Sequence, residues 1–518
     1  MSIRALEFAQ RLPRAEQIAL GLCAFIGLGL CYSLIVYMPI FGGDPEIHII
    51  FAKNLLAGYP LQFNPGDASS GETSPLYMVI VALFYELMGR FVPIAMKAMG
   101  VAGIFGIAWV IRREARREGA SAWMALALGL LPLLLPSMTA QAQLGMENAP
   151  FAFALLAFLQ AWMNRTAKTP TGLMLALGLP ALFFFRPEAV LLGGGIGLVI
   201  LANRDWKNLG YILLGGAIAG TIYFLIEWAT GAPLQAAGEL RAEISRISSI
   251  AVSLGASTLY LNPKPIIAIA YTSPFALLLF FHRKRVVRDE WIMLFALYLL
   301  PLILHVLNVF PSVHFSRYFM YAYAAFFYVF ARVMARKPAT KAHAAAVAAA
   351  ALLIGVTLVP YEQFTRSMQG RSLARDTIAA LDPAFKKTMS ERYFELLGHP
   401  PTPIVVATVE PQSRLFLDDR FVLRSLDGIV DYKLGAFVRE GWIDYLGYLK
   451  RRHVDFIVSY PAYSRDPNHF RLPDVIEGGG DYARDGVCFH RLGMMPQLRF
   501  LQPVYAVHYG TACQAARR

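Results

Sequence analysis

The chain has 518 residues, of which 56% are hydrophobic and 16% are charged, and its formal net charge is +13. A soluble globular domain carries about 25% charged residues, so this deficit excludes one large water-soluble core and favours a chain that lies mostly in lipid. Four cysteines are too few for a disulfide-rich scaffold. The basic excess fits binding to nucleic acid, binding to anionic lipid or a membrane topology signal, and the positions of the charges decide among these.

The first apolar run follows Arg11 and Arg14 and is long enough to span a bilayer. No small-residue cleavage site follows it, so we interpret it as a permanent span and not as a cleaved signal peptide. Apolar runs then recur along the chain, and together they predict about eleven spans, at 18–38, 92–111, 121–138, 149–163, 171–184, 189–203, 208–228, 265–282, 290–308, 318–334 and 343–360.

Basic residues cluster in every second loop between these spans. One set of loops holds nineteen of them, at Arg4, Arg11, Arg14, Arg112, Arg113, Arg116, Arg117, Arg165, Lys168, Arg204, Lys207, Arg283, Lys284, Arg285, Arg288, Arg332, Arg336, Lys337 and Lys341. The alternate loops up to position 360 hold seven. Cytoplasmic loops retain positive charge. The pattern therefore predicts a cytoplasmic N-terminus, residues after 360 on the outer side, and no nucleic-acid partner.

The apolar segment 75–89 has only fifteen residues, and counting it as a span would put the basic clusters outside. We therefore expect a helix that lies at the interface or re-enters from outside. The first outer loop then runs from about 39 to 91 and is structured. It belongs to a transmembrane module at 1–360.

Residues 361–518 are more polar and contain short β-like runs at 404–409 and 456–460, with a helical candidate at 431–452. This pattern predicts a small soluble α/β domain. Cys488 and Cys513 could pair if this domain is outside. The expected fold is thus a polytopic α-helical membrane protein with a C-terminal α/β domain.

Polar residues of the predicted outer side concentrate in four places, each just after a span. An ionisable residue at a membrane boundary is often functional, but each of these could instead have a purely structural role. Asp44 could cap a helix that begins near Pro45. Glu147 could be a solvated loop residue, and Arg186 could form a local ion pair with Glu188. His314 could be a hydrogen-bonded structural histidine, and Arg317 could be an arginine that snorkels to the membrane interface.

Several common cofactor motifs are missing from the sequence. It has no Walker loop, no dinucleotide-binding glycine fingerprint, no H-E-x-x-H and no C-x-x-C. This argues against a bound nucleotide or a tightly bound zinc ion, and we expect no cofactor.

The segment from Asp44 to Tyr77 resembles the first outer loop of the GT-C superfamily of membrane glycosyltransferases. It has an acidic residue after the first span, then an A-x-N-L-x-x-G helix, an N-P-G turn and a G-x-T-S-P-L-Y helix start. Further motifs follow in the order seen in the branch of bacterial arabinofuranosyltransferases that use a polyprenyl-phosphate sugar, namely Gly145-Met146-Glu147-Asn148, Arg186-Pro187-Glu188, His314 to Tyr318 and Leu426 to Asp431.

The resemblance implies a glycosyltransferase of the plasma (inner) membrane that acts on its outer face. It would move a sugar, with inversion, from a polyprenyl-phosphate donor to an envelope glycan, glycolipid or protein. Asp44 is the expected base. Donor phosphate contacts are expected from Arg186, His314 and Arg317, because arginine matches phosphate with a bidentate fork. The residues expected to position the sugar, the acceptor or the arginines are Glu46, His48, Asn64, Glu147 and Glu188.

One departure from the resemblance concerns metal binding. Many relatives have two adjacent acids where this chain has Gly43 and Asp44. A monophosphate donor also carries less charge than a diphosphate, so basic side chains could suffice, and we expect no metal ligands.

Two further function classes remain open. A transporter or flippase for a lipid or lipid-linked sugar would need polar residues at mid-bilayer, whereas Lys97 and Glu227 lie near the outer ends of their spans. A non-catalytic envelope scaffold would tolerate loss of Asp44.

Overall fold

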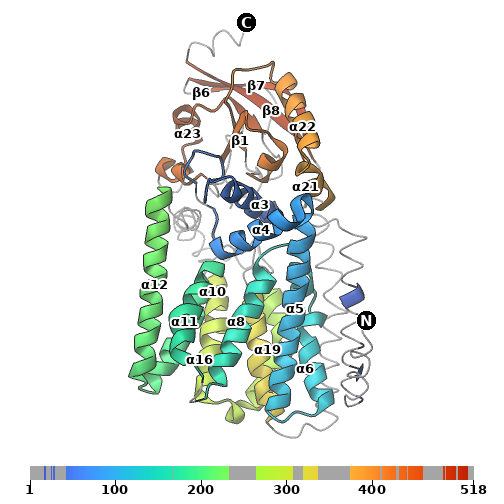
Figure 1. Cartoon of the computed structure of the whole chain (residues 1–518), viewed down its shortest axis with the longest axis vertical. Coiled ribbons are helices and arrows are strands. Elements are labelled where there is room, and N and C mark those ends of the chain that lie inside the picture. Colours follow the sequence, from blue (N-terminus) through green and yellow to red (C-terminus); the bar gives the residue numbers. More distant parts are fainter. Residues whose placement is uncertain are drawn as a thin grey trace. The chain divides into compact units, whose positions relative to one another are not determined.

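The computed structural model describes most of the chain, and its residues fall into two compact units. The described residues are 14, 17–18, 21, 25, 27–29, 43–69, 71–166, 169–232, 264–306, 319–336, 374–408, 411–426, 431–439, 442–458, 482–484, 486–497 and 500–510. We call the first unit the helical unit; it comprises Met1–Ile40, Ile94–Thr221 and Leu259–Gly370. The second, the sheet unit, comprises Phe41–Pro93, Ile222–Thr258 and Arg371–Arg518 (Figure 1).

Helices follow the expected spans between 92 and 334 within a few residues. They are α5 (Val92–Arg117), α6 (Ala122–Leu134), α7 (Pro136–Ala142), α8 (Asn148–Met163), α9 (Thr171–Leu173), α10 (Leu179–Phe185), α11 (Ala189–Ala202), α12 (Trp206–Thr230), α15 (Lys264–Phe281), α16 (Arg288–Leu294), α17 (Leu300–Val306) and α19 (Met320–Ala335). The expected span at 343–360 lies outside the described residues, as does most of the span at 18–38.

Three of the expected spans are not single regular helices. π-helical turns at Met174–Gly178 and Phe295–Leu299 join α9 to α10 and α16 to α17. The expected span 121–138 divides at Leu135, which is extended, because a residue before proline avoids the α conformation.

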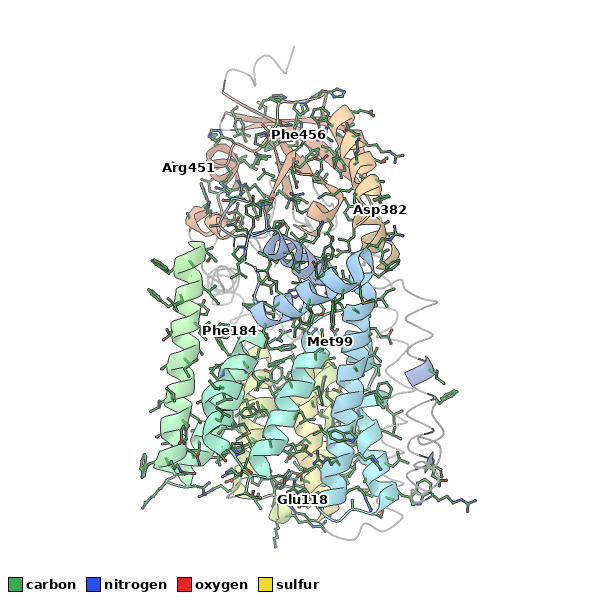
Figure 2. The ribbon with its side chains drawn as sticks, in the orientation of Figure 1. Met99, Glu118, Phe184, Asp382, Arg451 and Phe456 are labelled. Atoms are coloured by element: carbon green, nitrogen blue, oxygen red, sulfur yellow. The ribbon has the colours of Figure 1, made fainter. Side chains whose placement is uncertain are left out.

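The helices range from fully buried to largely exposed. Every residue of α19 is buried, and this helix packs against α6 and α8. In contrast, only 6% of the most apolar stretch of α12 is buried, and Figure 2 shows its side chains projecting outward. Exposed apolar surface of this size on a helix is the pattern of a lipid-facing element.

Two helical segments among the described residues are long and apolar enough to cross a membrane. They are Pro75–Arg117, which joins α4 (Pro75–Met88) to α5, and α12. The remaining apolar helices are shorter, at 10–17 residues.

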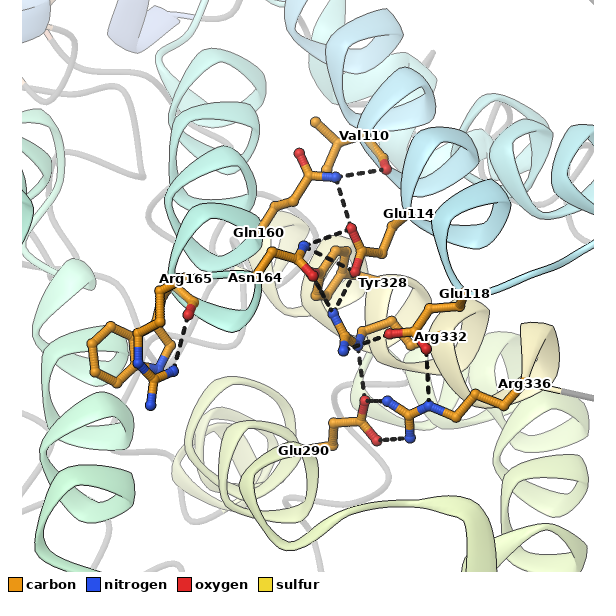
Figure 3. Close-up of polar contacts among 11 residues, drawn as sticks. Val110, Glu114, Glu118, Gln160, Asn164, Arg165, Glu290, Tyr328, Arg332 and Arg336 are labelled. Atoms are coloured by element: carbon orange, nitrogen blue, oxygen red, sulfur yellow. Dashed lines mark hydrogen bonds and ion pairs between the residues drawn. The ribbon is translucent and has the colours of Figure 1, made fainter. Parts of the chain in front are cut away.

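A buried network of charges joins helix ends in the helical unit (Figure 3). Arg332 of α19 contacts Glu114, Glu118 and Glu290, and its Nη2 lies 2.5 Å from Glu118 Oε1. Arg336 contacts Glu118 at 3.1 Å and Glu290 at 2.5 Å. The C-terminal ends of α5 and α19 therefore meet the start of α16.

The same end of the unit receives α8 and α11. Asn164, just after α8, donates to Glu114 at 2.8 Å, and Arg288 donates to Asn203 after α11. Basic clusters of the described loops thus gather at one end of the helical unit, as the alternation of the loops predicts.

The sheet unit is built on a mixed six-stranded sheet with the order β2-β1-β5-β8-β7-β6. The strands are β1 (Ile404–Thr408), β2 (Phe421–Ser425), β5 (Phe456–Val458), β6 (Tyr482–Arg484), β7 (Val487–Gln497) and β8 (Phe500–Tyr509). β1 pairs in parallel with β2 and β5, and the remaining pairs are antiparallel. Helices α21 (Ala374–Ala380), α22 (Pro383–Leu396) and α23 (Tyr445–Arg451) complete the α/β arrangement.

The expectation of one helix over 431–452 is wrong. The described residues there form a 3₁₀ segment (Tyr432–Phe437), a two-stranded ribbon of β3 (Val438–Arg439) and β4 (Trp442–Ile443), and then α23. Asp444 begins α23, where its carboxylate accepts a hydrogen bond from the Gly447 amide at 2.8 Å, and this is a helix N-cap.

The first loop groups with the C-terminal residues in the sheet unit. Its two helices, α3 (Gly43–Leu56) and α4, pack against each other. We expected residues 39–91 to belong to the module at 1–360, whereas the structure divides the chain with 41–93 and 371–518 together.

Candidate active site

Asp44 lies in the first turn of α3, and its side chain lies outside what the structure describes. The two other polar residues of this motif point into the sheet unit. Glu46 is fully buried, and its Oε1 accepts a hydrogen bond from the Thr377 hydroxyl of α21. His48 follows Asp44 by four residues, so helical geometry places the two on one face of α3.

His48 forms a buried pair with Glu72. Its Nδ1 lies 2.9 Å from Glu72 Oε2 and 3.0 Å from Oε1, and the Ser74 amide donates to the same carboxylate at 3.0 Å. The Tyr77 ring meets the imidazole edge-on at 5.0 Å. A carboxylate on Nδ1 fixes the tautomer and orientation of an imidazole. Glu72 was missed by the sequence reasoning, although it lies inside the G-x-T-S-P-L-Y motif.

Asn64 is bound to the backbone of β2. Its Nδ2 donates to the Leu423 carbonyl at 2.8 Å, and its Oδ1 accepts from the Leu423 amide at 3.0 Å. The amide group thus pairs with the outer edge of β2 as another strand would. Three residues on, Asp67 contacts Arg424, Lys433 and Arg452. The turn at residues 64–67 therefore binds the first loop to the C-terminal sheet.

Burial opposes ionisation of Asp67, but the charge of Arg424 and hydrogen bonds from Arg424 and Lys433 outweigh it. Together they hold the pKa of this carboxyl below its ordinary value of 3.8.

The second and third motifs converge on Arg186 in the helical unit. Its Nη1 lies 2.5 Å from Glu147 Oε1, and the same nitrogen donates to Asn148 Oδ1. Its Nε and Nη2 bond the two carboxylate oxygens of Glu188, at 3.1 and 2.6 Å. The side chains of Arg186, Glu147 and Glu188 are 6%, 4% and 9% exposed.

Helix termini place these groups together. Glu147 immediately precedes α8, Arg186 ends α10 and Glu188 immediately precedes α11. The sequence predicted the local pair of Arg186 with Glu188, but not the link to Glu147 and Asn148. With two carboxylates around one guanidinium, the positive charge of Arg186 is already compensated, which disfavours a direct phosphate contact of Arg186 itself. Arg186 thus holds two carboxylates in place at the helix ends, and carboxylate oxygens can accept further hydrogen bonds.

His314 and Arg317 lie outside the described residues. Asp44, Glu46, His48 and Asn64 belong to the sheet unit, whereas Glu147, Arg186 and Glu188 belong to the helical unit. The convergence of the two sets on one cavity stays a prediction. Within the described ranges, no three His, Cys, Asp or Glu side chains are grouped so that they could hold a metal ion.

No family model and no curated protein matches this chain. Solved structures do match it. The chain is similar to the crystal structure of ArnT from Cupriavidus metallidurans bound to undecaprenyl phosphate, with 12% identity, a TM-score of 0.51, and coverage of 94% of this chain and 97% of that one. Apo ArnT from the same organism gives 14% identity, the same TM-score, and coverage of 94% and 98%.

The fold is GT-C-like. This confirms the fold that the resemblance implies, since ArnT is a GT-C glycosyltransferase. The likeness extends over both units of the chain, so it includes the sheet unit as well as the helices. The arabinofuranosyltransferase-like branch stays a prediction.

Proposed function

We propose that the chain is a membrane glycosyltransferase that takes its sugar from a polyprenyl-phosphate donor. The observation that carries this is the likeness, over 94% of the chain, to ArnT with undecaprenyl phosphate bound. The ordered motifs of the GT-C resemblance support it independently, because they include the residues that such a reaction needs.

The proposed reaction is a single displacement with inversion. Asp44 accepts the proton of an acceptor hydroxyl, whose oxygen forms a bond to the anomeric carbon of the sugar. The bond from that carbon to the phosphate oxygen breaks, and its electron pair leaves with the polyprenyl phosphate. Cations are needed where this negative charge develops, and the proposal gives this role to His314 and Arg317.

The contacts of Arg186 support a different role for this residue within the proposal. Four donor contacts of Arg186 already go to Glu147, Asn148 and Glu188. We therefore assign Arg186 to holding Glu147 and Glu188 toward the sugar, in place of a direct phosphate contact. His48 and Glu46 support α3, the helix that carries Asp44.

We place the reaction on the outer face of the plasma (inner) membrane, with the N-terminus in the cytoplasm. The gathering of basic clusters at one end of the helical unit supports this orientation. Cys488 of β7 is disulfide-bonded, and its partner lies outside the described residues. Structural disulfides persist in oxidising compartments outside the cytoplasm. A reporter fused after residue 400 should be active outside, and cytoplasmic activity would overturn the orientation.

The function is tested by lipid extraction from a strain that lacks this protein. The proposal predicts an accumulating polyprenyl-phosphate sugar together with a truncated envelope glycan, glycolipid or glycoprotein. Complementation with the wild-type chain should reverse both, and Asp44→Asn should reverse neither. Unchanged lipid-linked sugars and an intact envelope would count against the proposal.

A further inference from the structure

Lys97 lies in the second turn of α5, and its side chain is buried with no acidic partner among the described residues. Its residue is only 3% exposed. Among the residues that the structure describes, it makes no hydrogen bond and no ion pair. Because a snorkelling lysine reaches the surface with its ammonium group, this degree of burial argues against snorkelling.

Two buried arginines of the helical unit, by contrast, are compensated. Arg332, with a side chain 9% exposed, contacts three carboxylates (Figure 3). Arg186 contacts two. Burying an ammonium group is unfavourable unless it is paired, so a buried lysine with no protein partner among the described residues is a candidate to bind an anionic ligand.

Glycines on α5 locate Lys97 within the unit. A Cβ on Gly100 would lie 2.0 Å from the Ala142 carbonyl oxygen, and one on Gly103 would lie 2.7 Å from the Ala149 carbonyl carbon. Gly100 follows Lys97 by three residues and so lies on the same helix face. Lys97 therefore lies one helical turn from the contact of α5 with the end of α7.

The opposite end of α5 carries Glu114, which bonds Gln160 and Asn164 at the far end of α8. Lys97 consequently lies at the end of the helical unit that holds the Arg186 cluster. In Figure 2, Met99 and Phe184 lie toward this end and Glu118 lies at the other. No ion pair joins Lys97 to either carboxylate of the Arg186 cluster.

We propose that Lys97 binds the phosphate of the polyprenyl-phosphate donor, an inference that rests on the proposed function. An ammonium group offers three N–H donors in a compact charge, which suits phosphate oxygens. The donor phosphate is a diester with one negative charge, and it gains charge as its bond to the sugar breaks. A lysine fixed beside it stabilises the departing polyprenyl phosphate more than the intact donor.

The test uses the purified full-length protein and three probes: undecaprenyl phosphate, undecaprenol and inorganic phosphate. Affinity is measured by titration for the wild type, for Lys97→Met, and for Lys207→Met, which makes the same change at an exposed lysine of α12. Lys97→Met should weaken undecaprenyl phosphate binding by roughly tenfold to a hundredfold, the value of one hydrogen bond to a charged group. It should leave undecaprenol binding unchanged, and Lys207→Met should change neither.

The outcomes separate this inference from the function on which it rests. If the wild type fails to prefer undecaprenyl phosphate over undecaprenol, the proposed function itself is contradicted. If the wild type has that preference and Lys97→Met keeps it, or loses both affinities equally, the role of Lys97 is overturned. Inorganic phosphate should not compete at the concentrations at which the lipid binds; equal competition would overturn the assignment to a lipid-borne phosphate.

A second readout guards against misfolding of the variant. Removing an unpaired buried charge should keep or raise the unfolding temperature of the ligand-free protein. A lower unfolding temperature for Lys97→Met than for Lys207→Met would show that Lys97 stabilises the fold, and this would contradict the proposal.

Discussion

Arg186 and Glu147 are 39 residues apart in the sequence, yet they form a buried ion pair with 2.5 Å between Nη1 and Oε1. Two motifs that look unrelated in the sequence are thus parts of one cluster at the ends of α8, α10 and α11. The position of the cluster at helix ends matters, because the backbone there is fixed by the packed helices. Its carboxylates can then be held for a substrate without a flexible loop.

Arg186→Met should destabilise the protein more than Glu147→Gln. Removing the guanidinium leaves two buried carboxylates without a counter-charge, which costs about 3–5 kcal/mol. Glu147→Gln leaves Arg186 paired with Glu188 and should cost about 1–3 kcal/mol. Unfolding in detergent measures both, with Arg117→Met at the exposed end of α5 as the control. Equal stability of Arg186→Met and Arg117→Met would contradict the assigned role.

Asn64→Ala should loosen the first loop from the sheet. The change leaves the amide and the carbonyl of Leu423 without the partners seen at 3.0 and 2.8 Å, at a cost of about 1–3 kcal/mol. Hydrogen exchange of the Leu423 amide should accelerate, whereas Asn208→Ala in α12 should leave it unchanged. If Asn64→Ala impairs transfer while Leu423 exchange stays slow, Asn64 acts on the substrate and not on the sheet.

The ion pairs of Asp67 with Arg424, Lys433 and Arg452 should weaken in acid. The pKa of Asp67 is held below 3.8 in the folded protein, so its ionised form is stabilised by folding. The stabilisation by ionised Asp67 is complete when the pH is above the pKa of Asp67 in the unfolded chain, about 3.9. It is lost as the pH falls through the lower pKa of Asp67 in the folded protein. Stability curves of the wild type and Asp67→Asn should therefore differ at pH 6 and converge below pH ~4. A difference that stays constant across this range would contradict the assignment.

Transfer should not depend on a divalent metal. Gly43 precedes Asp44 where many similar proteins have a second acid, and the proposal stabilises the departing phosphate with Lys97, His314 and Arg317. Activity of the purified enzyme should survive chelation by EDTA and should not rise when Mg²⁺, Mn²⁺ or Ca²⁺ is added back. Loss of activity with EDTA and its recovery with one of these ions would show that a metal is required.

The approximate positions of the helices could be predicted because apolar runs alternate with short polar, often basic, loops along the chain. Their interruptions could not. A π-helical turn such as Met174–Gly178 depends on how neighbouring helices pack, and hydropathy contains no signal for it. The division at Leu135 could have been predicted from Pro136, because proline restricts the residue before it.

Charge pairing was the main feature hidden from the sequence. Arg332 and Arg336 were interpreted as topology signals, yet they contact Glu114, Glu118 and Glu290, up to 218 residues away. Counting basic residues cannot show such pairs, because the loops meet only after the helices pack. The local pair of Arg186 with Glu188 was predictable because it spans two residues.

The error at 431–452 has a local cause. The apolar spacing there favours a helix, but Gly435, Gly441 and Asp444 interrupt it. Glycine lowers helix stability, and aspartate before a helical run is a start signal. Both features place the helix start near 445, where the structure has it.

The most direct test of the account is a transfer assay with purified protein. Lipid-linked sugar extracted from the deletion strain is the donor, and envelope material from that strain is the acceptor. The account predicts that the wild type releases free polyprenyl phosphate as sugar enters the acceptor. Asp44→Asn should release it at least a hundredfold more slowly, the lower end of general-base contributions of about 10²–10⁴. Equal release by the two proteins, or none by the wild type, would contradict the account.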